Sequence, residues 1–108
     1  MKKITPQPID SCDVAFTLSL IGGKWKPLIL WRLLPGTLRF SELKRRLPAV
    51  TERVLIRQLR ELETDGLVKR TVYKQLPPKV EYSLTPKAQS LQPLLYQLEQ
   101  WGKKNNTT

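Results

Sequence analysis

The stretch TERVLIRQLRELETDG, residues 51–66, predicts an amphipathic helix with a defined beginning and end. Thr51 is a favoured N-cap, and Gly66 suits the left-handed residue that follows a helix. At 100° per residue, two further leucines fall within about 40° of Leu55, and together they form one stripe. The sequence therefore predicts a helix over residues 51–65 that buries Leu55, Leu59 and Leu62.

Three arginines occupy the opposite side of this helix. Arg53, Arg57 and Arg60 lie about 140° to 200° from Leu55, and Ile56, at about 100°, is expected to be half exposed. A basic stripe is often only a solvated helix face. Here the acidic residues of the helix, apart from Glu52, collect at its C-terminal end, where the helix dipole does not favour them. Helix stability therefore does not explain this distribution of charge.

The segments on either side complete a winged helix-turn-helix pattern. Upstream, Ser41 is the predicted N-cap of a helix with the sequence ELKRRL, and Pro48 ends that helix before a tight turn. Downstream, residues 67–74 and 79–84 alternate with period two and are joined by QLPP, which predicts a hairpin. LRF, residues 38–40, can pair as one further strand.

The ends of the chain also read as helices. A helix over about 13–21 is predicted with Asp10, Ser11 or Asp13 as N-cap, and a second helix runs from about 25 to 34 with Pro27 in its first turn. Thr85-Pro86 predicts the start of a last helix, which Pro93 should kink or split. Its apolar residues recur with helical spacing, at Leu91, Leu94, Leu95, Leu98 and Trp101.

Length and composition limit the classes of function. The 108 residues fit one domain, predicted over residues 11–105 after a flexible arm at 1–10. A single cysteine and no histidine exclude an intramolecular disulfide and a multi-thiolate zinc site, and remove the usual general base. We therefore expect no enzyme, metal or cofactor. Neither a bilayer-spanning apolar run nor a signal peptide is recognised, so a cytoplasmic location is expected.

The net charge of +10, from 19 Lys and Arg against 9 Asp and Glu, favours an anionic partner. Basic residues mark the central helix, the helix before it and the hairpin, which is the distribution that a helix in the major groove and a wing on the adjacent backbone need. The predicted DNA-binding residues are Lys44, Arg45, Thr51, Arg53, Ile56, Arg57, Arg60, Lys74 and Lys79. The alternatives are charge that serves solubility, a non-specific nucleoid or RNA-binding protein, and an adaptor for membranes or proteins.

The order of these motifs resembles the HxlR-type winged helix-turn-helix transcriptional regulators, which are related to the MarR type. The resemblance covers about residues 11–104. It rests on Cys12, IGGKW at 21–25, LRFSEL at 38–43, the leucine pattern from Leu55 to GLV at 66–68, RxxY at 70–73, PxxVEYSLT at 77–85 and the final Trp101-Gly102.

The resemblance implies an α+β, mainly α fold with a two-stranded β-wing and terminal helices that build a homodimer. It also implies binding to pseudo-palindromic operator DNA, as a repressor, with residues 51–65 as recognition helix and 68–84 as wing. The dimer interface would then use Leu91, Leu94, Leu95, Leu98 and Trp101, although these residues can instead complete the core of one chain.

Cys12 is a candidate sensor of oxidants or electrophiles, because some members of this family use the equivalent cysteine in this way. With one cysteine, any disulfide has to join two subunits or a small thiol. The alternative is a partly buried cysteine with a structural role. The chain departs from the family in having Asp13 where a proline often follows the cysteine, and in having Pro27 in the second helix.

Overall fold

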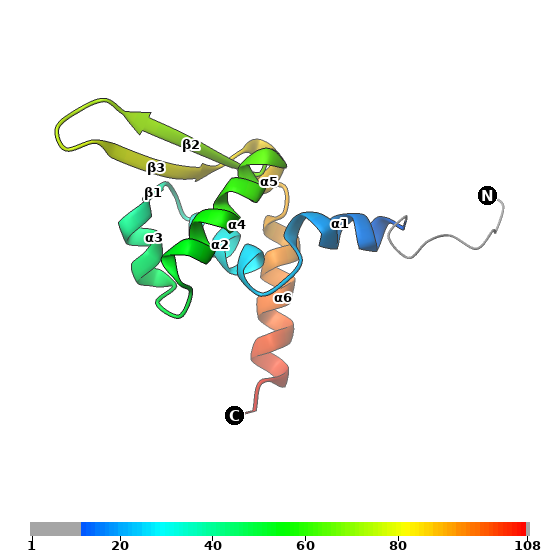
Figure 1. The fold of residues 1–108 in the computed structure, drawn as a ribbon. Helices are drawn as coiled ribbons and strands as arrows, with labels where there is room; N and C mark the ends of the chain where they lie inside the picture. The colour runs from blue at the N-terminus through cyan, green and yellow to red at the C-terminus, as the bar shows by residue number, and fades with distance from the viewer. Residues whose placement is uncertain (1–11, 108) are drawn as a thin grey trace.

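The computed structural model describes residues 12–107 and is mainly helical, with one small sheet (Figure 1). The flexible arm predicted for residues 1–10 lies outside the described residues. The elements follow in the order α1 (Asp13–Ile21), α2 (Trp25–Leu33), β1 (Leu38–Arg39), α3 (Phe40–Arg46), α4 (Glu52–Thr64), β2 (Val68–Tyr73), β3 (Lys79–Leu84), α5 (Pro86–Gln89) and α6 (Gln92–Asn105). This is the predicted winged helix-turn-helix, with α3 and α4 as its two helices.

The sheet is antiparallel, and its strand order is β1-β3-β2. Val68 pairs with Leu84 at the base of the wing, and Tyr73 pairs with Lys79 near its tip. On the other side of β3, Leu38 pairs with Tyr82. The two-stranded wing is therefore anchored by a third strand, and Phe40, predicted as the last residue of that strand, is the first residue of α3.

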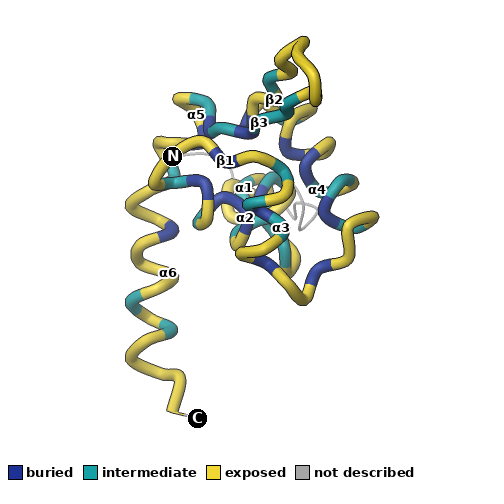
Figure 2. The backbone as a smooth tube through the Cα atoms, turned by 90° about the vertical axis from the view of Figure 1, so that its left-hand side faces the viewer, coloured by how far each residue is buried: buried dark blue, intermediate teal, exposed yellow. Residues whose placement is uncertain are grey.

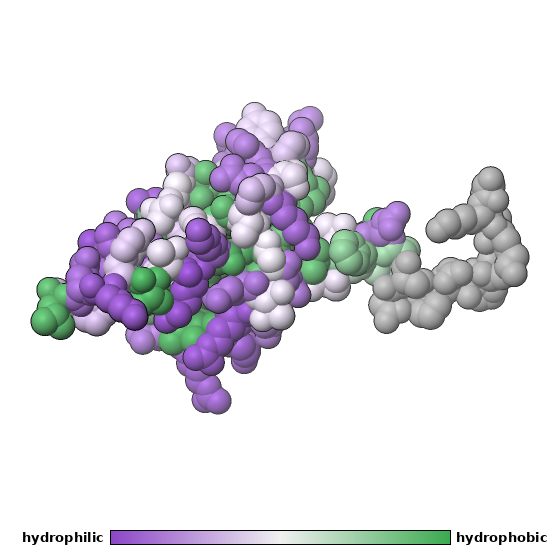
Figure 3. All heavy atoms as spheres, turned by 90° about the horizontal axis from the view of Figure 1, so that it is seen from above, coloured by the Kyte–Doolittle hydropathy of each residue, from purple (hydrophilic) through white to green (hydrophobic). Residues whose placement is uncertain are grey.

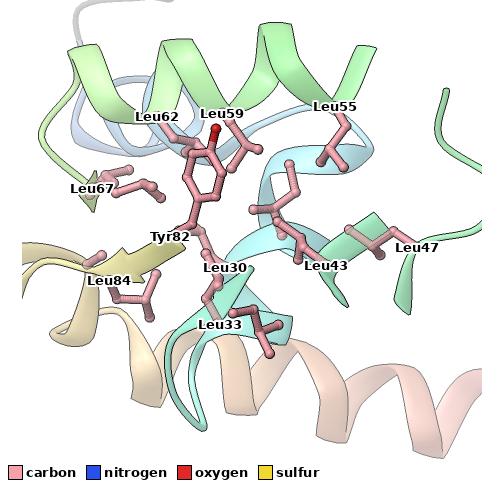
Figure 4. Close-up of a cluster of buried hydrophobic side chains, with 14 of the residues drawn as sticks. Leu30, Leu33, Leu43, Leu47, Leu55, Leu59, Leu62, Leu67, Tyr82 and Leu84 are labelled. Atoms are coloured by element: carbon pink, nitrogen blue, oxygen red, sulfur yellow. The ribbon is translucent and has the colours of Figure 1, made fainter. Parts of the chain in front are cut away.

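The core lies between α2, α3, α4 and the sheet, and most of its residues are leucines (Figure 4). The predicted stripe of α4 is confirmed, since Leu55, Leu59 and Leu62 are each at most 1% exposed. Tyr82 of β3 points toward the stripe from the sheet side. Burying these side chains contributes about 2 kcal/mol each before entropy is counted. The buried stripe thus fixes the rotation of α4 about its own axis. This rotation determines which side chains point into solvent on the opposite face of the helix.

Both ends of α4 are capped by the residues predicted from the sequence. The Thr51 hydroxyl accepts a hydrogen bond from the backbone N–H of Val54 at 3.1 Å. At the other end Gly66 has φ +76°, and the N–H of Leu67 donates to the carbonyl of Leu62 at 2.9 Å. This six-residue closure needs a residue with positive φ, which explains the glycine.

Two predicted N-caps are wrong, although the first helix spans the predicted residues 13–21. α1 is capped by Cys12, whose Sγ accepts from the backbone N–H of Ala15 at 3.3 Å, and Asp13 is its first helical residue. α3 begins at Phe40 with Arg39 as N-cap, not at the residue after Ser41. The reason is that Glu42 accepts a hydrogen bond from the N–H of Arg39 at 2.8 Å, so a glutamate three residues into the helix supplies the cap that Ser41 was expected to supply.

The split predicted at Pro93 is confirmed, because α5 ends at Gln89 and α6 begins at Gln92. Thr85 caps α5, with its hydroxyl accepting from the N–H of Ala88 at 3.2 Å. α6 extends away from the body as a largely exposed helix (Figure 2). Within residues 12–107, no helix combines the length and apolar character that crossing a membrane requires.

Candidate nucleic-acid interface

The exposed face of α4 carries the three predicted arginines. Arg53, Arg57 and Arg60 are all exposed, and Ile56 beside them is half-buried, as expected. Because the leucine stripe on the other face is fully buried, these guanidinium groups project from a helix whose rotation is fixed. A guanidinium has five N–H donors in a planar fork, which matches both guanine edges and phosphate oxygens.

One ion pair joins α4 to α2. The Lys26 ammonium lies 2.8 Å from Glu61 Oε1, with the lysine side chain 12% and the glutamate side chain 48% exposed. The hydrogen bond and charge of Lys26, with a smaller contribution from Arg57, lower the pKa of Glu61 below its ordinary value. Glu61 therefore stays ionised at neutral pH. Its place near the C-terminal end of α4, which the helix dipole does not favour, is explained by this contact with α2.

A groove of about 530 Å³ separates α4 from the sheet. Arg60 and Ile56 line it from α4, and Arg70 lines it from β2. Arg70 was not among the predicted DNA-binding residues. The signal that would have found it is strand register: Arg70 pairs with Tyr82, so its side chain is on the same face of the sheet, the face toward α4.

The two basic residues predicted to bind DNA from the last turn of α3, Lys44 and Arg45, differ in their contacts. Lys44 is half-buried, and its ammonium donates to the carbonyl of Pro48 at 3.4 Å, so it supports the turn. Arg45 is exposed and leaves its donors available. Thr51 uses a lone pair of its hydroxyl to cap α4, and the hydroxyl hydrogen can still donate to an anion at the helix N-terminus.

The two lysines of the wing also differ. Lys74 is exposed in the loop beyond β2. Lys79 instead lies over the ring of Tyr73, 4.3 Å from its centroid, and 3.6 Å from Glu81 Oε2. Glu81 also accepts a hydrogen bond from the Tyr73 hydroxyl, which raises the pKa of that tyrosine. The ammonium of Lys79 is thus engaged by other side chains of the wing, whereas the side chain of Lys74 extends into solvent.

The terminal helices carry exposed apolar side chains. On α1, Val14 and Leu18 are 70% and 57% exposed, whereas Ile21 is buried. On α6, Leu98 and Trp101 are 52% and 71% exposed. Figure 3 shows hydrophobic residues gathered where α1 leaves the body. Residues 12–107 of one chain do not cover these surfaces.

Only some of the residues predicted for the dimer interface on α6 are exposed in one chain. Leu95 is 3% exposed and belongs to the core, and Leu91 packs partly against that core. Leu94, Leu98 and Trp101 remain exposed. Leu98 borders a groove of about 240 Å³ between α2 and α6, which is lined by Pro27, Leu28, Trp31, Leu95, Leu98 and Glu99. Pro27, which departs from the family pattern, therefore shapes an apolar surface of α2 that faces α6.

Cys12 is exposed, so the alternative of a partly buried cysteine is wrong about its burial. Its sulfur nevertheless has a structural role as the N-cap of α1. Among residues 12–107, no group of three or more histidine, cysteine, aspartate or glutamate side chains is arranged to hold a metal ion.

Comparison with known proteins agrees with this geometry. Residues 20–108 match the HxlR-like helix-turn-helix family. YybR of Bacillus subtilis, described as an HTH-type transcriptional regulator, is 49% identical over 104 residues, which cover 96% of this chain and 82% of YybR.

Two solved structures share the fold. The redox regulator HypR in its oxidised form is 51% identical, with a TM-score of 0.84 over 87% of this chain and 97% of that chain. A Porphyromonas gingivalis protein assigned to the MarR family of transcriptional regulators is 35% identical, with a TM-score of 0.86 over 96% and 99% of the two chains. The family match spans most of the chain and includes both helices of the helix-turn-helix and the wing, so this protein belongs to the HxlR-like helix-turn-helix family of transcriptional regulators.

Proposed function

We propose that the protein binds operator DNA in a sequence-specific manner as a homodimer and represses transcription. The observation that carries this proposal is the outward arginine face of α4, made of Arg53, Arg57 and Arg60, which is held at a fixed roll by a buried leucine stripe. In a winged helix-turn-helix, such a face enters the major groove and the wing reaches the adjacent backbone. Repression follows when the bound dimer occupies promoter DNA.

A homodimer is supported by the terminal helices. Exposed apolar side chains lie on both helices, at Leu94, Leu98 and Trp101 of α6 and at Val14 and Leu18 of α1, and contiguous apolar surface of this kind marks protein–protein contacts. A two-fold dimer would cover this surface and present two copies of α4 to a pseudo-palindromic site. A protein that binds nucleic acid without sequence preference is the alternative, and the experiment on Arg57 distinguishes the two.

Arg57→Ala is expected to weaken operator binding by about 1–3 kcal/mol and to relax the preference at one base position. Arg57→Lys should lose the base preference as well, because it keeps the charge but not the planar fork. The measurement is a binding titration against the operator and against a set of single-base variants. An equal loss on every duplex would assign Arg57 to phosphate, and equal affinity of the unmodified protein for all duplexes would support the non-specific alternative.

Lys74→Ala is expected to reduce the slope of log K against log salt concentration by about 0.9, since one phosphate contact is lost, and to leave base preference unchanged. Lys79→Ala is the matched comparison in the same wing. Because Lys79 is engaged with Tyr73 and Glu81, its removal should change the slope less. The same slope for Lys74→Ala and the unmodified protein would remove the wing tip from the interface.

Redox control through Cys12 is a second element of the proposal. It is supported by the 51% identity to the redox regulator HypR and by the exposure of Cys12 at the start of α1, beside the apolar surface proposed for the dimer. Two Cys12 thiols would give up two hydrogens to an oxidant such as diamide and form one disulfide between subunits. That bond would tie the two α1 helices and change the spacing of the α4 pair.

Cys12→Ser is expected to abolish release of operator DNA by diamide and to leave binding without oxidant unchanged. The substitution is mild because serine is itself a favoured N-cap, so α1 keeps its first turn. The measurements are operator affinity with and without diamide, and non-reducing electrophoresis for a linked dimer. Release that persists in Cys12→Ser would end the redox hypothesis.

A further inference from the structure

The loop at the tip of the wing, residues 74–78, carries an apolar side chain at its centre. This side chain, Leu76, is 97% exposed, the highest value among the large hydrophobic side chains of residues 12–107. Leucine is not one of the residues that turn geometry favours, which are glycine, proline, asparagine, aspartate and serine. At this exposure its burial contributes nothing to the stability of the chain, and the whole side chain is available to a partner.

The proposed dimer does not cover Leu76. The other strongly exposed apolar side chains, such as Val14 and Trp101, belong to the terminal helices that are proposed to pair. The wing extends from the body in a direction away from both α1 and α6 (Figure 1), and hydrophobic atoms are visible at its end in Figure 3. The exposure of Leu76 therefore needs an explanation other than dimer formation.

The charge around Leu76 favours a polyanion as its partner. Residues 74–80 contain two lysines and no acidic residue. Lys74 is exposed, and the next acidic residue along the chain, Glu81, lies 3.6 Å from the ammonium of Lys79. Lysine is depleted in protein–protein interfaces, whereas it supplies much of the affinity for the phosphate backbone of DNA. An apolar side chain on a basic loop is therefore better suited to DNA than to a protein surface.

The wing is long and stiff enough to place Leu76 in a groove of the duplex. Strands β2 and β3 pair over six residues each, which gives a length of about 17 Å at the usual rise per residue. Half a turn of B-DNA, the distance from a major groove to the neighbouring minor groove, is also about 17 Å. Pro77 and Pro78 restrict the backbone of the loop, and β1 anchors the base of the wing. With α4 in the major groove, the tip of the wing thus reaches the adjacent minor groove.

We propose that Leu76 inserts between two base pairs in the minor groove beside each half-site and kinks the DNA there. Leucine is one of the apolar side chains that act as such wedges, and the kinks they produce are about 20–90°. Pyrimidine–purine steps such as TA and CA unstack most easily, so Leu76 selects them at a position that α4 does not contact. The placement of the wing rests on the proposed function. The wedge adds a specificity-determining residue outside the recognition helix.

The test uses the duplex most enriched from a random pool, with 2-aminopurine in the flanking pyrimidine–purine step and a donor and an acceptor dye at its two ends. Binding of the unmodified protein should raise the 2-aminopurine fluorescence, because the base loses its stacking, and should raise the energy transfer, because the ends approach each other. Leu76→Gln should lose both signals. Leu76→Met should keep them, since methionine is also an effective wedge. Both variants should fold normally, because the side chain is almost fully exposed.

Lys74→Ala is the matched control in the same loop. It should lower the salt slope and keep the fluorescence change, whereas Leu76→Gln should keep the slope and lose the change. Replacing the flanking TA step by the stiffer AA step should weaken binding of the unmodified protein about fivefold or more, because the cost of the kink depends on the step. The same replacement should leave the affinity of Leu76→Gln unchanged.

Equal fluorescence and energy transfer for Leu76→Gln and the unmodified protein would overturn the wedge. A changed state of association for Leu76→Gln with intact DNA binding would overturn it as well, and would assign Leu76 to a protein contact. If the random pool yields no preferred duplex, the proposed function fails, and the fluorescence is then measured on a duplex of repeated TA steps at saturating protein. A rise that Leu76→Gln loses supports the wedge on its own, and the absence of a rise refutes it.

Discussion

Leu98→Asp is expected to convert the protein to monomers and to weaken operator binding by about 10²–10⁴-fold. Leu98 is 52% exposed in one chain and borders an apolar groove with Leu28 and Pro27 of α2. A carboxylate placed there would have to be buried without a partner when a second chain packs on the surface. The loss of affinity is large because a monomer engages one half-site, and the second contact no longer occurs at high effective concentration.

Sedimentation velocity gives the state of association, and titration of a two-half-site duplex gives the affinity. Gln100→Asp is the matched control, because it introduces the same carboxylate on α6 at about 140° from Leu95, about 100° or more from each of Leu94, Leu98 and Trp101. It should remain a dimer with unchanged operator affinity. A Leu98→Asp protein that still sediments as a dimer would show that α6 is not the interface.

Leu55→Ala is expected to lower the free energy of unfolding by about 2–5 kcal/mol. Leu55 is fully buried where α4 meets α3, near Leu43 and Leu47 (Figure 4), so the missing methyl groups leave a cavity that the helices cannot close. A small domain is stable by only about 5–15 kcal/mol, so this change removes a large share of the total. The measurement is urea denaturation at one fixed protein concentration, since dimer formation adds to stability.

Ile56→Ala, one residue along the same helix, is the control for Leu55→Ala. Ile56 is half-buried at the edge of the groove toward the sheet, so its truncation removes less buried surface and should cost clearly less. Equal destabilisation by the two substitutions would mean that α4 does not pack through its leucine stripe. The orientation assigned to Arg57 would then be wrong as well.

The central helix could be predicted almost completely from local sequence. Thr51, the leucine spacing and Gly66 act within one segment, and each does in the structure what its local chemistry implies. The same holds for Thr85-Pro86 and for the split before Pro93, because proline and capping residues act through their own backbone. Helix starts with competing candidates were less predictable. Cys12 and Arg39 cap their helices although serine or aspartate stood beside them.

The candidate site was predictable where it depended on one helix and not where it depended on packing between elements. The arginine face of α4 follows from angles alone. The pairing of Glu61 with Lys26 does not, because these residues are 35 positions apart and meet only through the packing of α2 on α4. Lys79 and Lys74 were equally good candidates for a phosphate contact in the sequence. In the structure, contacts with Tyr73 and Glu81 engage the ammonium of Lys79.

These contacts suggest how the fold serves recognition. The leucine stripe sets the roll of α4, the Lys26–Glu61 ion pair connects its C-terminal half to α2, and β1 anchors the wing to the body. A recognition helix held by two separate contacts, next to a wing that is itself anchored, loses little conformational freedom on binding, so more of its contact energy appears as affinity.

Selection of bound duplexes from a random pool tests the central claim most directly. The account predicts enrichment of one sequence with two inverted half-sites, whose centres lie about one helical turn, or a multiple of it, apart. In the pool selected by Arg57→Ala, the preference should fade at the same position of both half-sites. Recovery of no preferred sequence, or of a single unrepeated site, would contradict the proposal that two copies of α4 read a pseudo-palindrome.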